Sequence, residues 1–334
     1  MVYIYKKIVS GKPYYYLRLS ERKGKRVIAK DVAYLGSNIE EVKKALDKLF
    51  QYKEEIRKAH RTINIFLETN YYLEKIKALK LKKDKFLLEK LEEVEACKWH
   101  YSKVFRELPE LTKKEIFKNY VIEFAYNTAS IEGNTINLEE ARNLLNEGIT
   151  PKDKTLREIY DLQNTEKVFL DILNNKLKEE LNNKLITDIH DRLLDNLDER
   201  KGYRTTDIRV VNSNFDASPG KYVRTDMELL LKWFNENKNK LHPLVLAIVF
   251  HHKFEKIHPF SDGNGRTGRM IINYILLKNN LPPMIIRKKF RKEYLEAMRE
   301  ADESDLWKLD EKSYSDLIIY CASEFIESYW NLFL

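Results

Sequence analysis

The chain has 334 residues, of which 43% are hydrophobic and 12% aromatic, and this composition excludes a disordered chain. Its net charge of +8 suits an anionic ligand or a nucleic acid, although lysines scattered over solvated helices give the same excess. No long uncharged apolar run is present, so we expect no membrane span. The two cysteines are far apart and no signal-peptide core begins the chain, which favours a cytoplasmic protein with neither a disulfide framework nor a zinc site.

Residues 1–37 are predicted to form a small basic β-hairpin module. β-Branched and aromatic residues alternate there with polar ones, in short stretches broken by turn residues at 10–13 and 22–25. The basic residues are Lys6, Lys7, Lys12, Arg18, Arg22, Lys23, Lys25, Arg26 and Lys30. A solvated sheet face, on which strand edges favour lysine, is the simpler interpretation, and a contact with nucleic acid is the alternative.

Residues 38–108 are predicted to form a helical arm. There is no glycine between Gly36 and Gly133, and no proline between Pro13 and Pro109. Apolar residues recur at three- and four-residue steps among many lysines and glutamates, which is typical of long amphipathic helices.

Residues 109–334 are predicted to form a compact helical domain, so that the fold class is mainly α. Helices are expected to begin at three capping boxes, formed by Thr112 with Glu115, Asn137 with Glu140, and Thr155 with Glu158. Further helices are expected at 187–195, 225–238, 243–256, 265–279 and 314–331. The exception is 207–223, where two short strands around a Ser-Pro-Gly turn would make a β-hairpin flap.

The segment 258–269, HPFSDGNGRTGR, has the composition of a phosphate site. Three glycines allow the backbone to approach a ligand closely, and an apolar-periodic helix follows at once, so free N–H groups at the helix N-terminus would form an anion nest. Arg266 and Arg269 lie three residues apart and can each hold a phosphate group. Because no Lys-Ser/Thr pair closes the turn and no βαβ unit surrounds it, neither a Walker A loop nor a dinucleotide fingerprint is indicated.

Two further side chains of this segment suit nucleotide chemistry. Asp262 offers a hard oxygen ligand for Mg²⁺ (or Mn²⁺) beside the phosphates, and His258 has the pKa range of a general base. The residues alone therefore predict a phosphate-binding turn with an adjacent base.

Residues 258–269 resemble the signature of the Fic family, HPFx[D/E]GNGRxxR, and every defined position of that signature is met. The resemblance extends over roughly residues 110–310. It implies a helical fold and a protein AMP-transferase that uses ATP and Mg²⁺ to modify a Ser, Thr or Tyr hydroxyl on a protein target, which could be the chain itself. By that resemblance, His258 would be the base and Asp262 the metal ligand. The phosphates would be held by Gly263, Asn264, Gly265, Arg266 and Arg269, and Tyr294 would line the adenine pocket.

A second resemblance lies about 130 residues upstream, where residues 128–133 match the family's inhibitory helix pattern [S/T]xxxE[G/N]. It implies that Glu132, set by Thr128 and Gly133 in a helix over 115–133, reaches Arg269 and displaces the γ-phosphate. The same glutamate is expected to allow removal of AMP from a modified target. An ordinary helix-terminal glutamate before a C-cap glycine is the simpler reading of these residues taken alone.

The alternatives left open are a Fic-type transferase that uses another nucleotide and a nucleic-acid-associated regulator that acts through the N-terminal module. The sequence also leaves a homodimer open and names no target protein.

Overall fold

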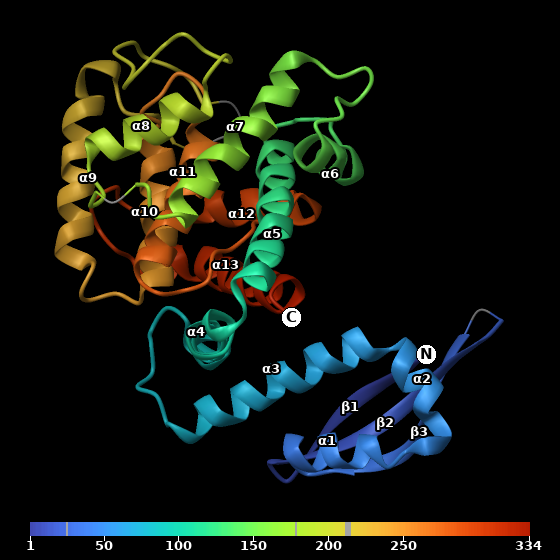
Figure 1. The fold of residues 1–334 in the computed structure, drawn as a ribbon. Helices are drawn as coiled ribbons and strands as arrows, with labels where there is room; N and C mark the ends of the chain where they lie inside the picture. The colour runs from blue at the N-terminus through green and yellow to red at the C-terminus, as the bar shows by residue number, and fades with distance from the viewer. Residues whose placement is uncertain (25, 178, 211–214) are drawn as a thin grey trace.

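The computed structural model describes residues 1–24, 26–177, 179–210 and 215–334, and its fold is mainly helical, as predicted (Figure 1). The strands are β1 (Val2–Val9), β2 (Lys12–Lys23) and β3 (Arg26–Gly36). The helices of the N-terminal part are α1 (Ile39–Asp47), α2 (Lys53–Lys58), α3 (His60–Ala78), α4 (Leu91–Lys103) and α5 (Glu110–Ile131). They are followed by α6 (Leu138–Glu147), α7 (Leu156–Leu173), α8 (Asn183–Leu193), α9 (Val223–Asn237), α10 (Pro243–Ile257), α11 (Asn264–Lys278), α12 (Arg291–Ala301) and α13 (Glu311–Leu332).

The first 36 residues form a three-stranded antiparallel sheet, which confirms the predicted β module. Strand β2 lies between β1 and β3 and pairs with both, so that the module consists of two consecutive hairpins. One face of the sheet is buried against α1 and α3 in a core of its own. The buried residues of that core are Val2, Ile4, Tyr15, Leu17, Leu35, Ile39, Val42, Ile63 and Leu67.

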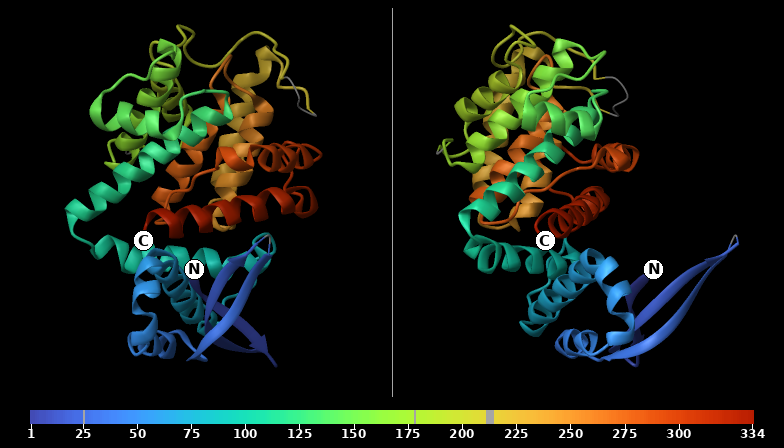
Figure 2. Two further views of the ribbon diagram at one scale, coloured as in Figure 1. Left: turned by 90° about the vertical axis from the view of Figure 1, so that its right-hand side faces the viewer. Right: turned by 45° about the vertical axis from the view of Figure 1, so that its right-hand side comes forward.

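The glycine-free stretch forms helices α1 to α5, as its periodicity predicted. Helix α3 leads away from the sheet and packs against α4, which in turn contacts α13 at the C-terminal end of the chain (Figure 2). Rings of Tyr72, His100 and Trp330 meet at this junction, and Arg61 donates to the backbone oxygen of Asn331 at 3.0 Å. The sheet module is thus attached to the helical body through α3 and α4.

The helical body is built around α10 and α11. Helix α10 is apolar from Leu244 to Phe250, and eleven consecutive residues, 244–254, are buried, among them His251, His252 and Lys253. It packs against α9, α11 and α13, while α11 also contacts α5, α7 and α8. The helices predicted at 187–195, 225–238, 243–256, 265–279 and 314–331 are confirmed as α8, α9, α10, α11 and α13.

Two of the three predicted capping boxes are present, those at Asn137 with Glu140 and at Thr155 with Glu158. The box at Thr112 was wrong, because α5 begins two residues earlier, at Glu110. Pro109 is the N-cap, and its carbonyl oxygen accepts from the N–H of Lys113 at 3.0 Å, so the first helical turn is closed before Thr112 is reached.

The hairpin predicted at 207–223 falls partly on residues 211–214, which lie outside the described residues. Of the rest, 207–210 and 215–219 contain no assigned strand, and Gly220–Tyr222 is a 3-10 turn that leads into α9. Side chains organise this segment: Asp207 accepts from the N–H of Gly220 at 2.7 Å, and Arg204 donates to the carbonyl oxygens of Thr206 and Ser218. For the described residues, this replaces the predicted pair of strands.

No helix within the described part of the chain is long and apolar enough to cross a membrane.

The contact between α10 and α11 depends on Gly268. A Cβ atom at this position would lie 2.7 Å from Cε1 of His251, and closer still to its Nδ1. Alanine normally stabilises a helix interior relative to glycine, by about 1 kcal/mol. We expect Gly268→Ala instead to lower the free energy of unfolding by about 1–3 kcal/mol, because the two helices must separate to admit the methyl group.

Thermal or urea unfolding of the full chain measures this change. Combining Gly268→Ala with His251→Ala should cost less than the sum of the two single changes, since the second removes the ring that the methyl group meets. A Gly268→Ala protein as stable as the parent would show that the helices do not meet here.

Candidate active site

The predicted motif forms a tight loop between α10 and α11. His258 is the C-cap of α10 with φ 51° and ψ 62°, and Gly263 is the N-cap of α11 with φ 75°, so both ends of the loop have left-handed backbone. The side-chain amide of Asn264 donates to the carbonyl oxygen of Phe260 at 2.8 Å and accepts from its N–H at 2.9 Å. The side chain of Asn264 therefore shapes the loop. Only the backbone N–H of Asn264 could take the predicted part in binding an anion.

Arg204 fastens this loop to the segment before α9. Its side chain is buried beneath the loop, and its guanidinium group and backbone N–H are all engaged. The acceptors are the carbonyl oxygens of Pro259, His258, Thr206, Ser218 and Ile257. Since the carbonyl groups at the C-terminal end of α10 have no helical partner, Arg204 satisfies them and holds His258 in its left-handed conformation.

The imidazole of His258 is oriented by the last turn of its own helix. Its Nδ1 lies 3.3 Å from the backbone oxygen of Glu255 and 3.8 Å from Oε2 of the same residue. A proton on Nδ1 is thereby held toward Glu255, which leaves Nε2 as the nitrogen that can accept a proton. Burial lowers the pKa of His258, against the raising effect of the Glu255 carbonyl, so the ring is neutral at pH 7.

Glu255 is a site residue that the sequence analysis missed. Burial raises its pKa to about 8, the charge of Glu132 adds to this effect, and Arg269 opposes it. The carboxyl group is therefore largely protonated at neutral pH. It lies between the imidazole of His258 on one side and the Glu132–Arg269 ion pair on the other. Its signal in the sequence was the single acidic residue of α10, shortly after the apolar run from Leu244 to Phe250.

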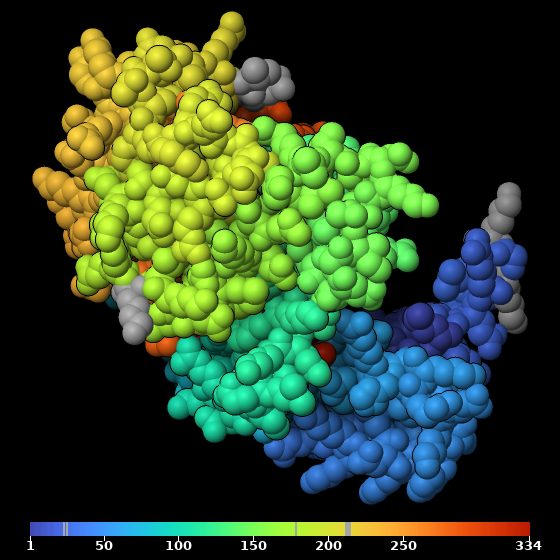
Figure 3. Space-filling model, turned by 45° about the horizontal axis from the view of Figure 1, so that its top comes forward, coloured from blue at the N-terminus to red at the C-terminus, as the bar shows by residue number. Residues whose placement is uncertain are grey.

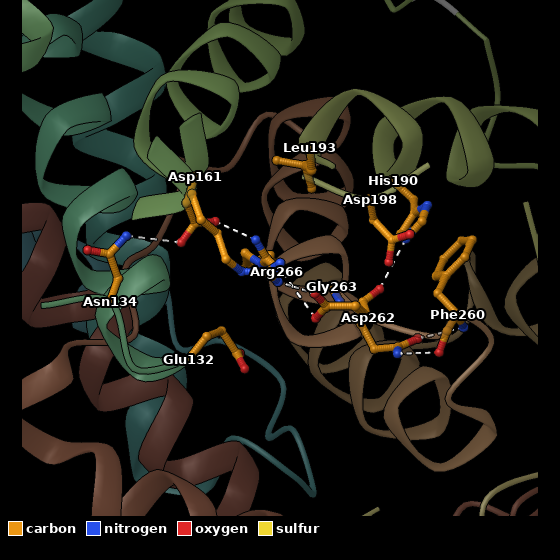
Figure 4. A network of polar contacts seen from close by, with 12 residues as sticks. Glu132, Asn134, Asp161, His190, Leu193, Asp198, Phe260, Asp262, Gly263 and Arg266 are labelled. Carbon is orange, nitrogen blue, oxygen red and sulfur yellow. Dashed lines mark hydrogen bonds and ion pairs between the residues drawn. The ribbon is translucent and has the colours of Figure 1, made fainter. Parts of the chain in front are cut away.

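Asp262 and Arg266 belong to a buried ionic network that reaches α7 (Figure 4). Arg266 donates to Asp161 at 2.5 Å and to Asp262 at 3.2 Å, and Asn134 donates to Asp161 at 3.2 Å. Asp262 also accepts from Arg157 at 2.5 Å. Burial raises the pKa of Asp262, but the positive charge of Arg266 and the other donors outweigh it, so the pKa is lowered and Asp262 is ionised.

Asp161 was not predicted, although an acidic residue on the apolar face of α7 could have indicated it. It fixes the position of Arg266, whose side chain is buried. Arg266 is thus held by two carboxylates in the structure, whereas the sequence analysis assigned it to a phosphate.

Arg269 lies against the C-terminal end of α5. Its Nε donates to Oγ1 of Thr128 at 2.7 Å, and its Nη2 donates to Oε1 of Glu132 at 2.6 Å. Glu132 is the C-cap of α5, and Gly133 follows with φ 101°, as expected of a helix that ends here. The structure therefore brings Thr128, Glu132 and Arg269 together, as the resemblance implied.

The absence of a side chain at Gly265 makes room for this contact. A Cβ atom there would lie 2.9 Å from Nη1 of Arg269 and would overlap Oε1 of Glu132. The Glu132 carboxylate thus lies directly over the first turn of α11, where the unpaired N–H groups and the helix dipole favour negative charge.

A cavity of about 400 Å³ opens beside these residues, a size suited to a small-molecule ligand. The predicted residues that line it are Glu132, His258, Asp262, Gly263, Asn264, Gly265, Arg269 and Tyr294. Glu255, Arg291, Arg299 and Asp302 complete the polar part of the wall, and Ile131, Leu295 and Met298 provide apolar surface. The arrangement combines a neutral base, a helix N-terminus and three arginines around one cavity.

Tyr294 and Asp302 are both turned toward histidines of α10. The hydroxyl of Tyr294 lies 2.6 Å from Nε2 of His251, and Oδ1 of Asp302 lies 3.0 Å from Nε2 of His252. These contacts anchor α12 to α10, so the two residues shape the far wall of the cavity. The described residues contain no cluster of three or more His, Cys, Asp or Glu side chains that could hold a metal ion, so Asp262 would have to share one with a bound ligand.

Comparison with known proteins finds a family model that matches the part of the chain containing this loop. The model described as the Fic/DOC family matches residues 180–276. Protein adenylyltransferase fic-1 of Caenorhabditis elegans is 30% identical over 187 residues, which make up 55% of this chain and 37% of that protein. Protein adenylyltransferase Fic of Culex quinquefasciatus is 32% identical over 203 residues, or 58% of this chain and 39% of that protein. The chain thus spans well under half the length of these curated relatives.

A solved structure shows the same fold. The Fic domain containing signaling protein of Bacteroides thetaiotaomicron aligns with a TM-score of 0.64 at 23% identity, covering 71% of this chain and 95% of that protein. The matched residues 180–276 include the loop from His258 to Gly263 and α11 as far as Leu276. Over residues 180–276 the chain therefore carries a domain that is similar to the Fic/DOC family.

Proposed function

We propose that this chain is a protein adenylyltransferase, which transfers AMP from ATP to a Ser, Thr or Tyr hydroxyl of a protein target and is inhibited by Glu132. The observation that carries the proposal is the position of His258, a neutral base with Nδ1 engaged, in the wall of a cavity that is also lined by the N-terminus of α11. Two curated relatives that align with more than half of this chain are named protein adenylyltransferase, which supports the nucleotide and the reaction.

The chemistry is a displacement at the α-phosphorus of ATP. The target hydroxyl oxygen forms a bond to that phosphorus, its proton passes to Nε2 of His258, and the bond to pyrophosphate breaks. Positioning and charge stabilisation supply most of the rate enhancement in reactions of this kind. Since His258 is neutral at pH 7, no prior deprotonation is required.

The phosphate oxygens would be held by the backbone N–H groups of Asn264 and Gly265 and by Arg269, because the N–H of Gly263 already donates to Oδ1 of Asp262 at 2.6 Å. The helix dipole of α11 points its positive end at the same position. Asp262 suits a Mg²⁺ ion shared with the phosphates, because one ionised carboxylate is the usual protein contribution to such an ion. When bound, the ion would neutralise charge that develops on the phosphate oxygens.

Inhibition follows from competition for Arg269. A guanidinium group that already donates to the Glu132 carboxylate offers less to a phosphate, and two negative groups over the first turn of α11 repel each other. Glu132 would therefore displace the γ-phosphate and leave ATP bound unproductively. Thr128 keeps Arg269 in place whether or not Glu132 is present, because the Arg269 side chain donates to both the hydroxyl and the backbone oxygen of Thr128.

The reverse activity, removal of AMP from a modified target, is the second candidate. The Glu132 carboxylate is about 40% exposed and lies in the wall of the same cavity, where it could orient a water molecule. Incubating AMP-modified target with the parent protein and with Glu132→Gly separates the two activities, because only the parent would release AMP.

Replacing Glu132 by glycine should increase automodification. Arg269 then loses its carboxylate partner while keeping its bonds to Thr128, so the γ-phosphate gains a donor. We expect incorporation of label from α-labelled ATP to rise at least about tenfold, which corresponds to about 1.4 kcal/mol. Glu147→Gly, which removes an exposed acidic residue from the end of α6, is the matched control and should change nothing. Equal labelling of the Glu132→Gly and parent proteins would refute inhibition by this residue.

Replacing His258 by alanine in the Glu132→Gly protein should reduce transfer by a factor of about 10²–10⁴, the usual contribution of a general base. Binding of ATP, measured by calorimetry, should remain within a few-fold, because no phosphate-holding group is removed. His60→Ala, a change at an exposed histidine at the start of α3, serves as the control. Transfer that survives the loss of His258 would assign the base to another residue.

The pH dependence of transfer should show a pKa for the base, His258, that lies below the ordinary range of histidine. An unperturbed histidine titrates near about pH 6.5, and burial lowers the pKa of His258. The neutral, active form therefore persists as the pH falls to 6.5, and the rate should decline only below that value. Removing the negative charge of Glu132 shifts the pKa of His258 further in the same direction. Initial rates of the Glu132→Gly protein, with circular dichroism to verify folding at each pH, test this; an acid limb centred above pH 6.5 would contradict it.

A further inference from the structure

The sheet module carries nearly all of the net charge of the protein. Residues 1–36 contain nine lysines and arginines but only two acidic residues, Glu21 and Asp31. The module thus accounts for seven of the eight net positive charges of the chain, while the remaining 298 residues are almost neutral. Because solvated helices elsewhere balance their lysines with glutamates, this concentration is a property of the module.

The face of the sheet opposite α1 and α3 is rich in tyrosine and also carries Lys7, Arg22 and the ion pair of Arg18 with Asp31, which lie 2.6 Å apart. Its register places Tyr5 beside Tyr16 and Tyr16 beside Tyr34, across all three strands. The ring centroids of Tyr16 and Tyr34 are 5.4 Å apart, and the guanidinium of Arg18 lies 3.6 Å from the centroid of Tyr5. The outward residues that surround these rings are Tyr3, Lys7, Tyr14, Arg22 and Asp31.

Strands β2 and β3 extend beyond the end of β1 and form a two-stranded ribbon there. The last β1 pairing is Val2 with Leu19, whereas β2 and β3 remain paired as far as Lys23 and Arg26. The ribbon points away from the helical body (Figures 2 and 3). Its exposed basic residues include Arg22, Arg26 and Lys30, and Lys23 and Lys25 belong to the same stretch of sequence.

We propose that this module binds duplex DNA, with the β2–β3 ribbon in the major groove. Arg22 on the outer face of the ribbon and Arg26 and Lys30 on its opposite face would contact the phosphates. A two-stranded ribbon matches the width of the B-form major groove, and lysine and arginine supply the phosphate contacts that dominate affinity. Tyrosine hydroxyls donate to phosphate oxygens in such interfaces. The inference is independent of the proposed transferase activity, since none of these residues belongs to the site at His258.

Duplex DNA fits better than a single strand. Stacking of bases requires free ring faces, but Arg18 covers the ring of Tyr5, and Tyr14, Tyr16 and Tyr34 pack against one another at tilted angles. Duplex RNA fits less well, because its major groove is too narrow and deep for a ribbon.

A membrane surface fits less well than DNA for a different reason. Peripheral membrane binding needs one contiguous apolar patch among the basic residues. Apart from Tyr34, whose ring packs against Tyr16, the exposed apolar residues of the sheet are divided between Ile8 and Val9 near one hairpin turn and Val27 and Ile28 near the other. Their partners on β2, Pro13 for Ile8 and Arg22 for Val27, lie nine residues apart, so the two pairs are at opposite ends of the sheet, about 30 Å from each other.

Fluorescence anisotropy of the full chain with a mixed-sequence DNA duplex of about two helical turns tests the proposal. We expect binding whose affinity falls steeply with salt, by about one unit of logarithmic slope for each phosphate contact. The variant with Arg22→Gln, Arg26→Gln and Lys30→Gln should bind at least about tenfold more weakly and reduce that slope by about three units.

The charge-matched control replaces three exposed lysines of the helical body, Lys114, Lys232 and Lys240, by glutamine. It should retain the parent's affinity and salt slope, and circular dichroism should show both triple variants folded. If the two triple variants lose the same amount of affinity for the duplex, the loss comes from net charge alone, and the proposal is overturned. Absence of duplex binding at low salt would also overturn it, as would tighter binding of the matching single strand or of vesicles that contain anionic lipid.

Discussion

The packing of α10 against α11 is the constraint on which the rest of the site depends. The two helices approach closely because Gly268 has no side chain opposite His251, and the short loop between them is then closed by Asn264 and fastened by Arg204. His258 at the end of one helix and the free N–H groups at the start of the other come to lie on the same side. A base and an anion site thus share one cavity through backbone geometry.

The second feature of the site is the distribution of its charges. Arg266 is neutralised from within the domain by Asp161 and Asp262, whereas Arg269 is shared with Glu132, a residue of a different helix. Buried guanidinium groups require such partners, because an unpaired buried charge is strongly destabilising. A phosphate that enters the cavity can replace the partner of Arg269 more readily than those of Arg266, since the Glu132 side chain is far more exposed than that of Asp161. This difference makes Glu132 the natural point of control.

The basic sheet and the helical body are built as separate cores joined by α3 and α4. Such a division lets one part meet a polyanion while the other binds a nucleotide, because the surfaces involved do not overlap. The link is structured rather than loose: aromatic rings around Tyr72 and Trp330 fill the junction. The two parts therefore keep a defined relation, and a ligand on the sheet would hold the cavity near a particular macromolecule.

The sequence alone determined the elements and the chemical groups. Period-two alternation placed the sheet, capping boxes at Asn137 and Thr155 placed two helices, and the motif from His258 to Arg269 indicated a nucleotide site, because these signals are local. Only the tertiary structure decided which groups meet. It paired Arg266 with Asp161 across 105 residues, set Glu255 beside His258 and capped α5 at Pro109, where the sequence pattern had suggested Thr112. Contacts between distant segments depend on how helices pack, and no local pattern records that.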